Sequence, residues 1–223
     1  MVLADDEPLM LAGLAAILDA QPDIEVLGTA PDGQQAVELV VRTQPDVVCL
    51  DIEMPVMNGI EATRELLSRQ ETQVVMLTTF RREDYLVDSL QAGASGFLLK
   101  TATPEQLAES IRTVASGEAL LTPEMTQALI RRTVHAVSAA QDSAAQSSPA
   151  QDSTVEPLSQ RERDVLAQAA LGLSNSEIGE RLFIGAETVK THMSRVLAKL
   201  QLRNRVQAVA YAHRQGIVAD SPE

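Results

Sequence analysis

The sequence predicts two domains of different class, a doubly wound α/β domain followed by a small domain made only of helices. Three observations lead to this prediction. Short apolar runs alternate with amphipathic stretches in the first half, the segment before Pro157 is poor in apolar residues, and the pattern after Pro157 is purely helical. Alternating strand and helix patterns favour a parallel sheet covered by helices, whereas short helices with tight connections favour a helix-turn-helix.

Five short apolar runs are the predicted strands of the first domain. An amphipathic pattern follows each of them, and the last begins at Thr103 as N-cap, with Leu107, Ile111 and Val114 at helical spacing. Five such units predict a flavodoxin-like sheet with strand order 2-1-3-4-5. The predicted strands are residues 2–4, 24–28, 47–50, 74–77 and 96–99.

Composition places the domain boundaries. Residues 138–157 are mostly Ala, Ser, Gln, Asp and Pro, which cannot bury much apolar surface and are typical of a flexible linker. Ser159 with Glu162, and Ser174 with Glu177, are capping boxes that start the first two helices after the linker. The predicted parts are 1–118 (α/β domain), 119–157 (connecting helix and linker) and 158–223 (helical domain, with helices near 160–171, 175–182, 186–200 and 205–215).

The net charge of −13 is unevenly distributed. Residues 1–118 hold 20 acidic and 7 basic side chains, whereas Thr188–Ala219 holds six basic side chains and no acidic one. An acidic half and a locally basic segment indicate two tasks, one of which suits nucleic acid. The single cysteine, Cys49, excludes an internal disulfide, and no signal peptide or membrane-length apolar run is visible. We therefore expect a cytoplasmic protein without a membrane partner.

Acidic side chains gather at the predicted carboxyl edge of the sheet. Asp5 and Asp6 follow the first strand, and Asp51 ends the third. Because strands 1 and 3 are neighbours at the switch point of the sheet, the three carboxylates converge where such folds bind ligands. Their repulsion favours a cation, and Mg²⁺ prefers oxygen ligands. Thr78 and Lys100 end strands 4 and 5, which completes a set suited to accepting a phosphoryl group.

The segments LADDEP, LDIEMPVMNG, LTT and GFLLK, which begin at residues 3, 50, 77 and 96, resemble the receiver domains of two-component response regulators. The resemblance implies that Asp51 is the phosphoacceptor. It also implies a Mg²⁺ ion that Asp51 and Asp6 ligate directly, Asp5 mainly through water, and Glu53 through its backbone carbonyl. Family members usually have a longer first strand, so we expect either a weakened sheet or a start upstream.

The same resemblance assigns three positions around the phosphoryl group. Thr78 is expected to bond a phosphoryl oxygen, and Lys100 to pair with the phosphate. Phe97 matches the aromatic residue whose rotamer reports phosphorylation. Cys49, within the apolar third strand, is expected to have a buried structural role.

The segments LSQRERDVL, SEIG and ETVKTH, which begin at residues 158, 176 and 187, resemble the LuxR-type domain of the NarL/FixJ regulators. Periodicity agrees, since Val189, Met193 and Val196 share the face of the third helix that should pack inward. Gly185 occupies the expected N-cap of this helix and offers no side-chain bond. The resemblance implies groove contacts from Lys190, Thr191 and Ser194, and phosphate contacts from His192, Arg195, Lys199, Arg203 and Arg205.

The last helix carries more apolar surface than an edge helix needs. By the same resemblance, Val206, Val209 and Ala210 form a dimer interface on DNA, while packing within the domain is the alternative.

The resulting hypothesis is a DNA-binding response regulator. A sensor histidine kinase phosphorylates Asp51, which promotes a homodimer and binding to promoter DNA at an inverted repeat. The chain is not expected to be an enzyme beyond self-phosphorylation and slow self-dephosphorylation of Asp51. In a second hypothesis the acidic domain covers the recognition helix in the inactive state.

Two other functions stay open on the residues alone. One is a DNA binder whose first domain works without phosphorylation. The other is a Mg²⁺-dependent phosphatase of the aspartyl-phosphate kind, in which Glu53 is the second acid after the nucleophile.

Overall fold

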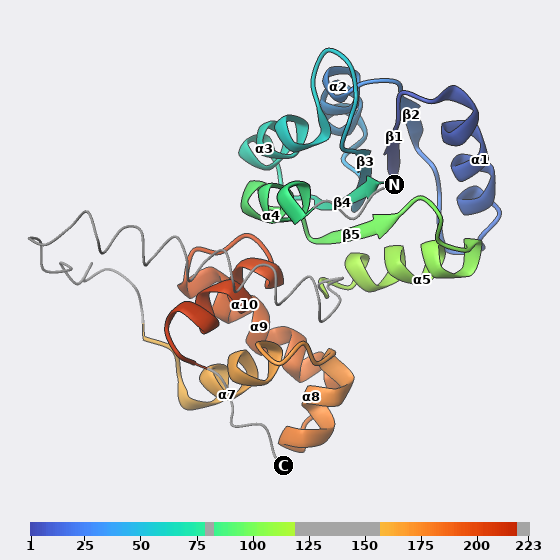
Figure 1. The fold of residues 1–223 in the computed structure, drawn as a ribbon. Helices are drawn as coiled ribbons and strands as arrows, with labels where there is room; N and C mark the ends of the chain where they lie inside the picture. Colours follow the sequence, from blue (N-terminus) through green and yellow to red (C-terminus); the bar gives the residue numbers. More distant parts are fainter. Residues whose placement is uncertain (79–82, 119–156, 218–223) are drawn as a thin grey trace, which may run out of the picture. The chain divides into compact units, whose positions relative to one another are not determined.

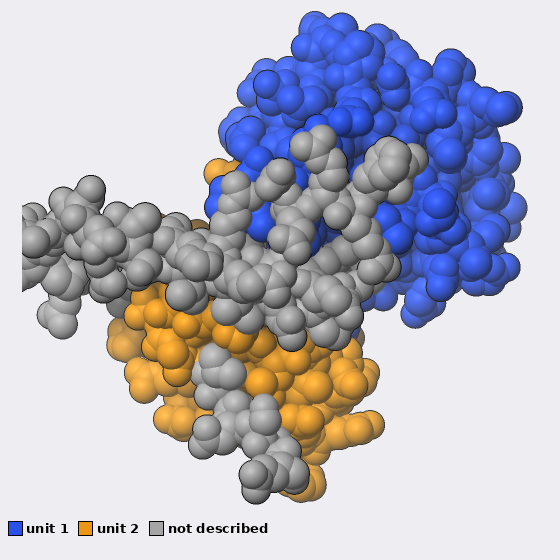
Figure 2. Space-filling model, viewed as in Figure 1, with its two compact units in different colours: residues 1–120 blue, residues 121–223 orange. Residues whose placement is uncertain are grey.

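A computed structural model of the chain describes residues 1–78, 83–118 and 157–217. The chain divides into two compact units, residues 1–120 and 121–223 (Figure 2). The predicted connecting helix and linker lie outside the described residues, Pro157 excepted, so the predicted boundaries stay predictions. None of the helices in the described ranges combines the length and the hydropathy of a membrane span.

The first unit is built on a five-stranded parallel sheet with the predicted order β2-β1-β3-β4-β5 (Figure 1). Helices α1 and α5 cover one face of the sheet, and α2, α3 and α4 cover the other. The strands are β1 (Val2–Ala4), β2 (Gly28–Ala30), β3 (Val47–Asp51), β4 (Gln73–Thr78) and β5 (Gly96–Leu99). The helices are α1 (Pro8–Asp19), α2 (Gly33–Thr43), α3 (Gly59–Arg69), α4 (Glu83–Ala92) and α5 (Pro104–Ala115).

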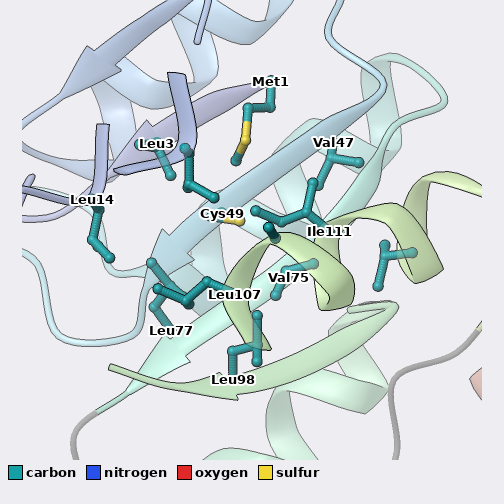
Figure 3. Close-up of a cluster of buried hydrophobic side chains, with 13 residues drawn as sticks. Met1, Leu3, Leu14, Val47, Cys49, Val75, Leu77, Leu98, Leu107 and Ile111 are labelled. Carbon is teal, nitrogen blue, oxygen red and sulfur yellow. The ribbon is translucent and has the colours of Figure 1, made fainter. Parts of the chain in front are cut away.

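An aliphatic core lies between the sheet and the pair α1 and α5. Alternate strand residues such as Leu3, Val75 and Leu98 point toward Leu14 of α1 and Leu107 of α5 (Figure 3). Burial of each such side chain contributes about 1.5–3 kcal/mol, and the core contains no aromatic ring. The core therefore fixes the strands whose carboxyl ends bear the acidic residues.

Cys49 is part of this core. Its side chain is buried, and burial raises the pKa of the thiol to about 12. The thiol thus stays protonated and unreactive at neutral pH. The structural role predicted for Cys49 agrees with this placement.

Strand β2 differs from its prediction. Residues 24–27 are irregular, and the strand begins only at Gly28, which pairs with Val2. The segment before Gly28 is held by other bonds. The N-terminal ammonium of Met1 donates to the Glu25 carbonyl at 2.6 Å, and Leu27 N–H donates to the Met1 carbonyl at 2.8 Å. Val26 N–H donates to the Asp19 carboxylate at 3.1 Å. Of the predicted residues 24–28, only Gly28 therefore belongs to the strand.

Helix α5 begins as predicted. Thr103 is its N-cap, Pro104 is in the first turn, and Gln106 closes a capping box in which side chain and backbone bond reciprocally. A cap of this kind contributes about 1 kcal/mol. Helix α3 has a similar box formed by Asn58 and Glu61, which anchors the helix directly after the loop that follows β3.

Residues 157–217 of the second unit form four short helices, as predicted. The expected capping boxes, Ser159 with Glu162 and Ser174 with Glu177, are both present, and Gly185 caps its helix without a side-chain bond. Apolar side chains from all four helices form a core separate from that of the first unit. The helices are α7 (Gln160–Ala169), α8 (Asn175–Leu182), α9 (Ala186–Lys199) and α10 (Arg205–Arg214).

A tight turn joins α8 to α9. Phe183 ends α8 in the left-handed conformation, with φ 55°, and its ring is almost fully exposed. A side chain at Gly179 would place its Cβ 2.6 Å from the Ile184 carbonyl oxygen, so the close approach requires glycine here. The turn makes α8 and α9 a helix-turn-helix.

Gly59→Ala tests how tightly α3 is held against β3. The new Cβ would lie 2.0 Å from the backbone oxygen of Asp51, so helix and strand must separate. We expect the free energy of unfolding in urea to fall by about 3 kcal/mol or more. The matched control is Gly13→Ala in α1, where the added Cβ has no neighbour within 4 Å. That change should stabilise by roughly 0.5–1 kcal/mol. Equal stabilities of the two variants would contradict the packing.

Candidate functional site

Three carboxylates meet at the carboxyl edge of the sheet, as predicted. Asp5 and Asp6 follow β1, Asp51 is the last residue of β3, and one ligand oxygen from each lies within 4.8 Å of the others. Asp5 is 1% exposed and Asp51 7%, whereas Asp6 is exposed. Two of the three charges are therefore removed from water, which makes their mutual repulsion costly.

Lys100 provides the cation that the chain itself brings to this cluster. Its ammonium nitrogen lies 2.7 Å from Asp5 Oδ2 and 3.1 Å from Asp51 Oδ2, and its side chain is almost fully buried. The backbone is fixed by Lys100 N–H, which donates to the Thr78 carbonyl at 2.8 Å. Burial alone would lower the pKa of Lys100, but the bonds to Asp5 and Asp51 outweigh it and raise the pKa. Lys100 is thus charged throughout the physiological range.

The positive charge of Lys100 does not fully offset the cost of burying the Asp51 carboxylate. Burial raises the pKa of Asp51, and the charge of Asp5 adds to this effect, although Lys100 and the Ile52 N–H oppose it. The Ile52 N–H donates to Asp51 Oδ1 at 2.8 Å, which leaves Oδ2 toward Lys100. The orientation of the carboxylate is therefore set by one backbone donor and one ammonium.

The cluster has the donors and the spacing of a Mg²⁺ site. Asp5 Oδ1 accepts from the Glu7 N–H at 3.0 Å, while the buried Oδ2 has no hydrogen-bond partner among the described residues besides its ion pair with Lys100. Oxygen ligands on one octahedral Mg²⁺ are about 3 to 4 Å apart, so the three carboxylates need little movement to share an ion. A buried acidic cluster of this kind could hold a divalent cation.

Three other predicted residues lie around the same edge. Thr78 is buried at the end of β4, beside Leu99 of β5, and Phe97 is buried on β5 beside Met76. Glu53 is exposed in the loop after β3.

The loop after β3 is fixed at several points. Gly59 N–H donates to the Ile52 carbonyl at 3.0 Å, and Gly33 N–H donates to the Met57 carbonyl at 3.1 Å. Between these bonds, Val56 has φ 66°, a conformation that is costly for a β-branched residue, and its side chain is exposed. Such a backbone conformation persists only where the surrounding structure holds it in place. The loop that follows Asp51 is therefore fixed relative to this carboxylate.

Sequence reasoning did not find two participants. Tyr85 of α4 donates its hydroxyl to Glu53 Oε1 at 2.7 Å, and Glu7 lies 4.0 Å from the Lys100 ammonium. Glu7 directly follows the acid pair, so its proximity could have been anticipated. No local pattern connects Tyr85 with Glu53, which is 32 residues away.

Helix α9 presents a polar face in the second unit. Val189, Met193 and Val196 are buried, which confirms the predicted inward face. On the other face Thr191 and Ser194 donate their hydroxyls to helix carbonyls one turn back, at 2.9 and 3.0 Å. Their oxygens can therefore still accept hydrogen bonds. The exposed residues of this face are Glu187, Lys190, Thr191, Ser194, Arg195 and Ala198.

His192 lies at the border of this face. It is half-buried, and its Nδ1 is buried without a hydrogen-bond partner among the described residues. Arg203, after α9, is exposed. Both placements are compatible with the predicted phosphate contacts.

Two predicted DNA contacts, Arg205 and Lys199, have partners within the unit. Arg205 is only 5% exposed, and its guanidinium donates to Asn175 Oδ1 and to the Leu173 carbonyl, each at 2.5 Å. Lys199 lies 3.0 Å from the buried carboxylate of Glu162. Both cations thus connect helices within the unit, because their side chains can reach buried acceptors that the sequence does not reveal.

The predicted dimer residues of α10 are less accessible than expected. Val206 and Val209 are 1% and 3% exposed, and Ala210 is half-buried. In this structure the two valines offer little surface to a second copy.

Comparison with known protein families agrees with both units. A model of the response regulator receiver domain matches residues 1–112, and a model of the luxR family of bacterial regulatory proteins matches residues 156–212. These matches, with the sheet and the helix-turn-helix, place the protein in the class of DNA-binding response regulators. The chain belongs to the family of two-component transcriptional regulators that join a receiver domain to a LuxR-type DNA-binding domain. This is a family of regulators and not of enzymes.

Individual relatives match over almost the whole chain. The uncharacterized transcriptional regulatory protein YxjL of Bacillus subtilis (strain 168) is 41% identical over 98% of this chain and 96% of its own length. The transcriptional regulatory protein LiaR of the same strain is 39% identical over 98% of both chains. Among solved structures, the response regulator ChrA of a heme-sensing two-component system is 34% identical, with a TM-score of 0.50 over 97% of both chains.

Asp51→Asn tests whether the acidic cluster is under electrostatic strain. Because the pKa of Asp51 is higher in the folded chain than in the unfolded chain, the folded state loses relative stability as pH rises from about 4 through the folded pKa. The variant should therefore have a higher Tm than the wild type at pH 7 without divalent cations, and this advantage should disappear toward pH 3.

Added Mg²⁺ should raise the Tm of the wild type more than that of Asp51→Asn, because only the wild type keeps all three carboxylates. Thermal unfolding by circular dichroism measures both effects. A variant that is less stable than the wild type at pH 7 without Mg²⁺ would contradict the interpretation.

Arg205→Ala and Arg203→Ala separate an internal arginine from an exposed one. Loss of the Arg205 guanidinium leaves two acceptors without their donor, so unfolding of the second unit in urea should become easier by about 2–3 kcal/mol. Arg203→Ala should change stability by less than about 0.5 kcal/mol. It should instead reduce the slope of the logarithm of the DNA-binding constant against the logarithm of salt concentration by about one, because one phosphate contact is lost. A stable Arg205→Ala variant with reduced salt dependence would restore the sequence-based prediction.

Proposed function

We propose that the protein is a transcription factor whose Asp51 accepts a phosphoryl group from a sensor histidine kinase. The single observation that supports this most is the Lys100 ammonium, which lies within 3.1 Å of both Asp5 and Asp51 in an acid cluster that could hold a metal ion. In the transfer, an Asp51 oxygen forms the new bond to phosphorus while the bond from phosphorus to the donor nitrogen breaks. Lys100 would offset the charge that arrives with the phosphoryl group.

The remaining residues of this edge have supporting roles. Asp5, Asp6 and Asp51, with the backbone carbonyl of Glu53, would hold Mg²⁺, which screens the phosphoryl oxygens from the acidic cluster. Thr78 would donate its hydroxyl to a phosphoryl oxygen, and Phe97 would change rotamer as Thr78 moves. Both are buried on neighbouring strands, and Phe97 pairs with Met76, two residues before Thr78 along β4.

The output is binding to DNA through α9. Lys190, Thr191 and Ser194 lie on its exposed face and would read base edges, while His192, Arg195 and Arg203 would contact phosphates. Phosphorylation would favour a homodimer, which places two such helices over an inverted repeat in a promoter. Because the target is chromosomal DNA, we expect the protein to act in the cytoplasm. Val206, Val209 and Ala210 remain the proposed contact between the two DNA-bound units, after a local opening that exposes the valines.

The alternative functions have less support. A DNA binder without phosphorylation would not need Lys100 between two buried carboxylates. A phosphatase would need Glu53 as a free second acid, but Tyr85 holds the carboxylate of Glu53 at 2.7 Å. Besides phosphoryl transfer from the kinase, we propose self-phosphorylation of Asp51 from small donors and its slow self-dephosphorylation.

The test is phosphorylation of the full chain with acetyl phosphate and Mg²⁺. Mass spectrometry should find one phosphoryl group on the wild type and none on Asp51→Ala. Phosphorylation should increase the dimer fraction in sedimentation. In a binding selection from genomic DNA, it should reproducibly enrich one set of fragments. Labelling of Asp51→Ala, or labelling that alters neither dimerisation nor DNA affinity, would falsify the proposal.

A further inference from the structure

One side-chain hydrogen bond near the phosphoacceptor has no part in the function proposed above. The hydroxyl of Tyr85, in the first turns of α4, donates to Glu53 Oε1 at 2.7 Å. Glu53 is the second residue after Asp51. The bond therefore connects the immediate surroundings of the phosphoacceptor with helix α4.

The backbone before Glu53 is fixed relative to Asp51. The Ile52 N–H donates to Asp51 Oδ1 at 2.8 Å, and the Ile52 carbonyl accepts from the Gly59 N–H at 3.0 Å. The torsion angles of the Glu53 side chain are not fixed by these backbone bonds. A glutamate side chain has several rotamers, and the bond to Tyr85 selects one in which the carboxylate is held by α4.

The direction of this carboxylate matters to a phosphorylated Asp51. Hydrolysis forms a bond from phosphorus to a water oxygen and breaks the bond from phosphorus to the Asp51 oxygen, which leaves as a carboxylate. The water must also give up a proton, and a nearby carboxylate is a suitable acceptor. A Glu53 side chain that is free to approach the phosphoryl group would therefore shorten its lifetime.

We propose that Tyr85 is a positioning residue that prolongs phosphorylation of Asp51, because its hydroxyl holds the Glu53 carboxylate away from the attacking water. This inference rests on Asp51 being the phosphoacceptor. In this proposal Tyr85 acts through the Glu53 carboxylate, which accepts its hydroxyl. The length of the phosphorylated state is thus set in part by a bond to α4.

The experiment measures the half-life of phosphorylation in the full chain. Protein is phosphorylated with acetyl phosphate and Mg²⁺, the donor is removed, and loss of the phosphoryl group is followed by mass spectrometry. Tyr85→Phe, which keeps the ring and removes the hydroxyl, should shorten the half-life about three- to tenfold, a small part of what a fully placed general base supplies. Tyr211→Phe, which changes the only other tyrosine, is the matched control and should have no effect.

The Glu53 variants show whether Tyr85 acts through this carboxylate. Glu53→Ala should have a half-life no shorter than the wild type, and Tyr85→Phe in the Glu53→Ala background should have no further effect. An unchanged half-life in Tyr85→Phe, or an equal loss in the Glu53→Ala background, overturns the inference. If none of the variants is labelled and the wild type is not labelled either, it is the proposed function that fails.

A second measurement reports the bond itself. The chain has two tyrosines and no tryptophan, so Tyr85 is the only emitter in a Tyr211→Phe background. A carboxylate that accepts from the tyrosine hydroxyl quenches its fluorescence, and Glu53→Ala in this background should therefore increase the emission. Unchanged emission would mean that the bond is not populated in solution, which also overturns the inference.

Discussion

The placement of the Lys100 ammonium between Asp5 and Asp51 is the interaction on which the rest of the receiver unit depends. Two buried carboxylates at one edge of a sheet are tolerable only with a buried cation, and Lys100 reaches them because β5 ends beside β4. The compensation is incomplete, since burial still raises the pKa of Asp51. That residual cost is what a divalent cation can relieve, so the same geometry that strains the folded chain prepares it for a metal ion.

Much of the fold could be predicted because its signals are local. The capping boxes at Thr103, Ser159 and Ser174 lie within four residues each, and the order of apolar runs implies the parallel sheet. Strand β2 lies further along the chain than predicted, because its register pairs Gly28, Thr29 and Ala30 with the three residues of β1. Local sequence indicates that a strand exists, whereas its ends are decided by the partner strand.

The site divides in the same way. Asp5, Asp6 and Asp51 could be brought together from the sequence because strand ends in a parallel sheet share an edge. The bond from Arg205 to Asn175 could not be predicted, since a basic residue at the start of a helix looks the same in the sequence whether it faces solvent or a buried amide. The bond from Tyr85 to Glu53 also escaped, because it joins distant segments without any pattern in either. Contacts between elements, rather than element types, are what the structure adds.

The separate aliphatic cores of the two units have a consequence for how such regulators diversify. Residues that hold the acidic edge pack with α1 and α5, whereas the face of α9 is supported by Val165, Ile178 and Ala208. A substitution within one of these clusters therefore changes side-chain packing that the other cluster does not share. An ancestral gene could exchange one half by recombination and keep the other intact. One type of receiver domain can in this way be inherited with DNA-binding domains that recognise different DNA sequences.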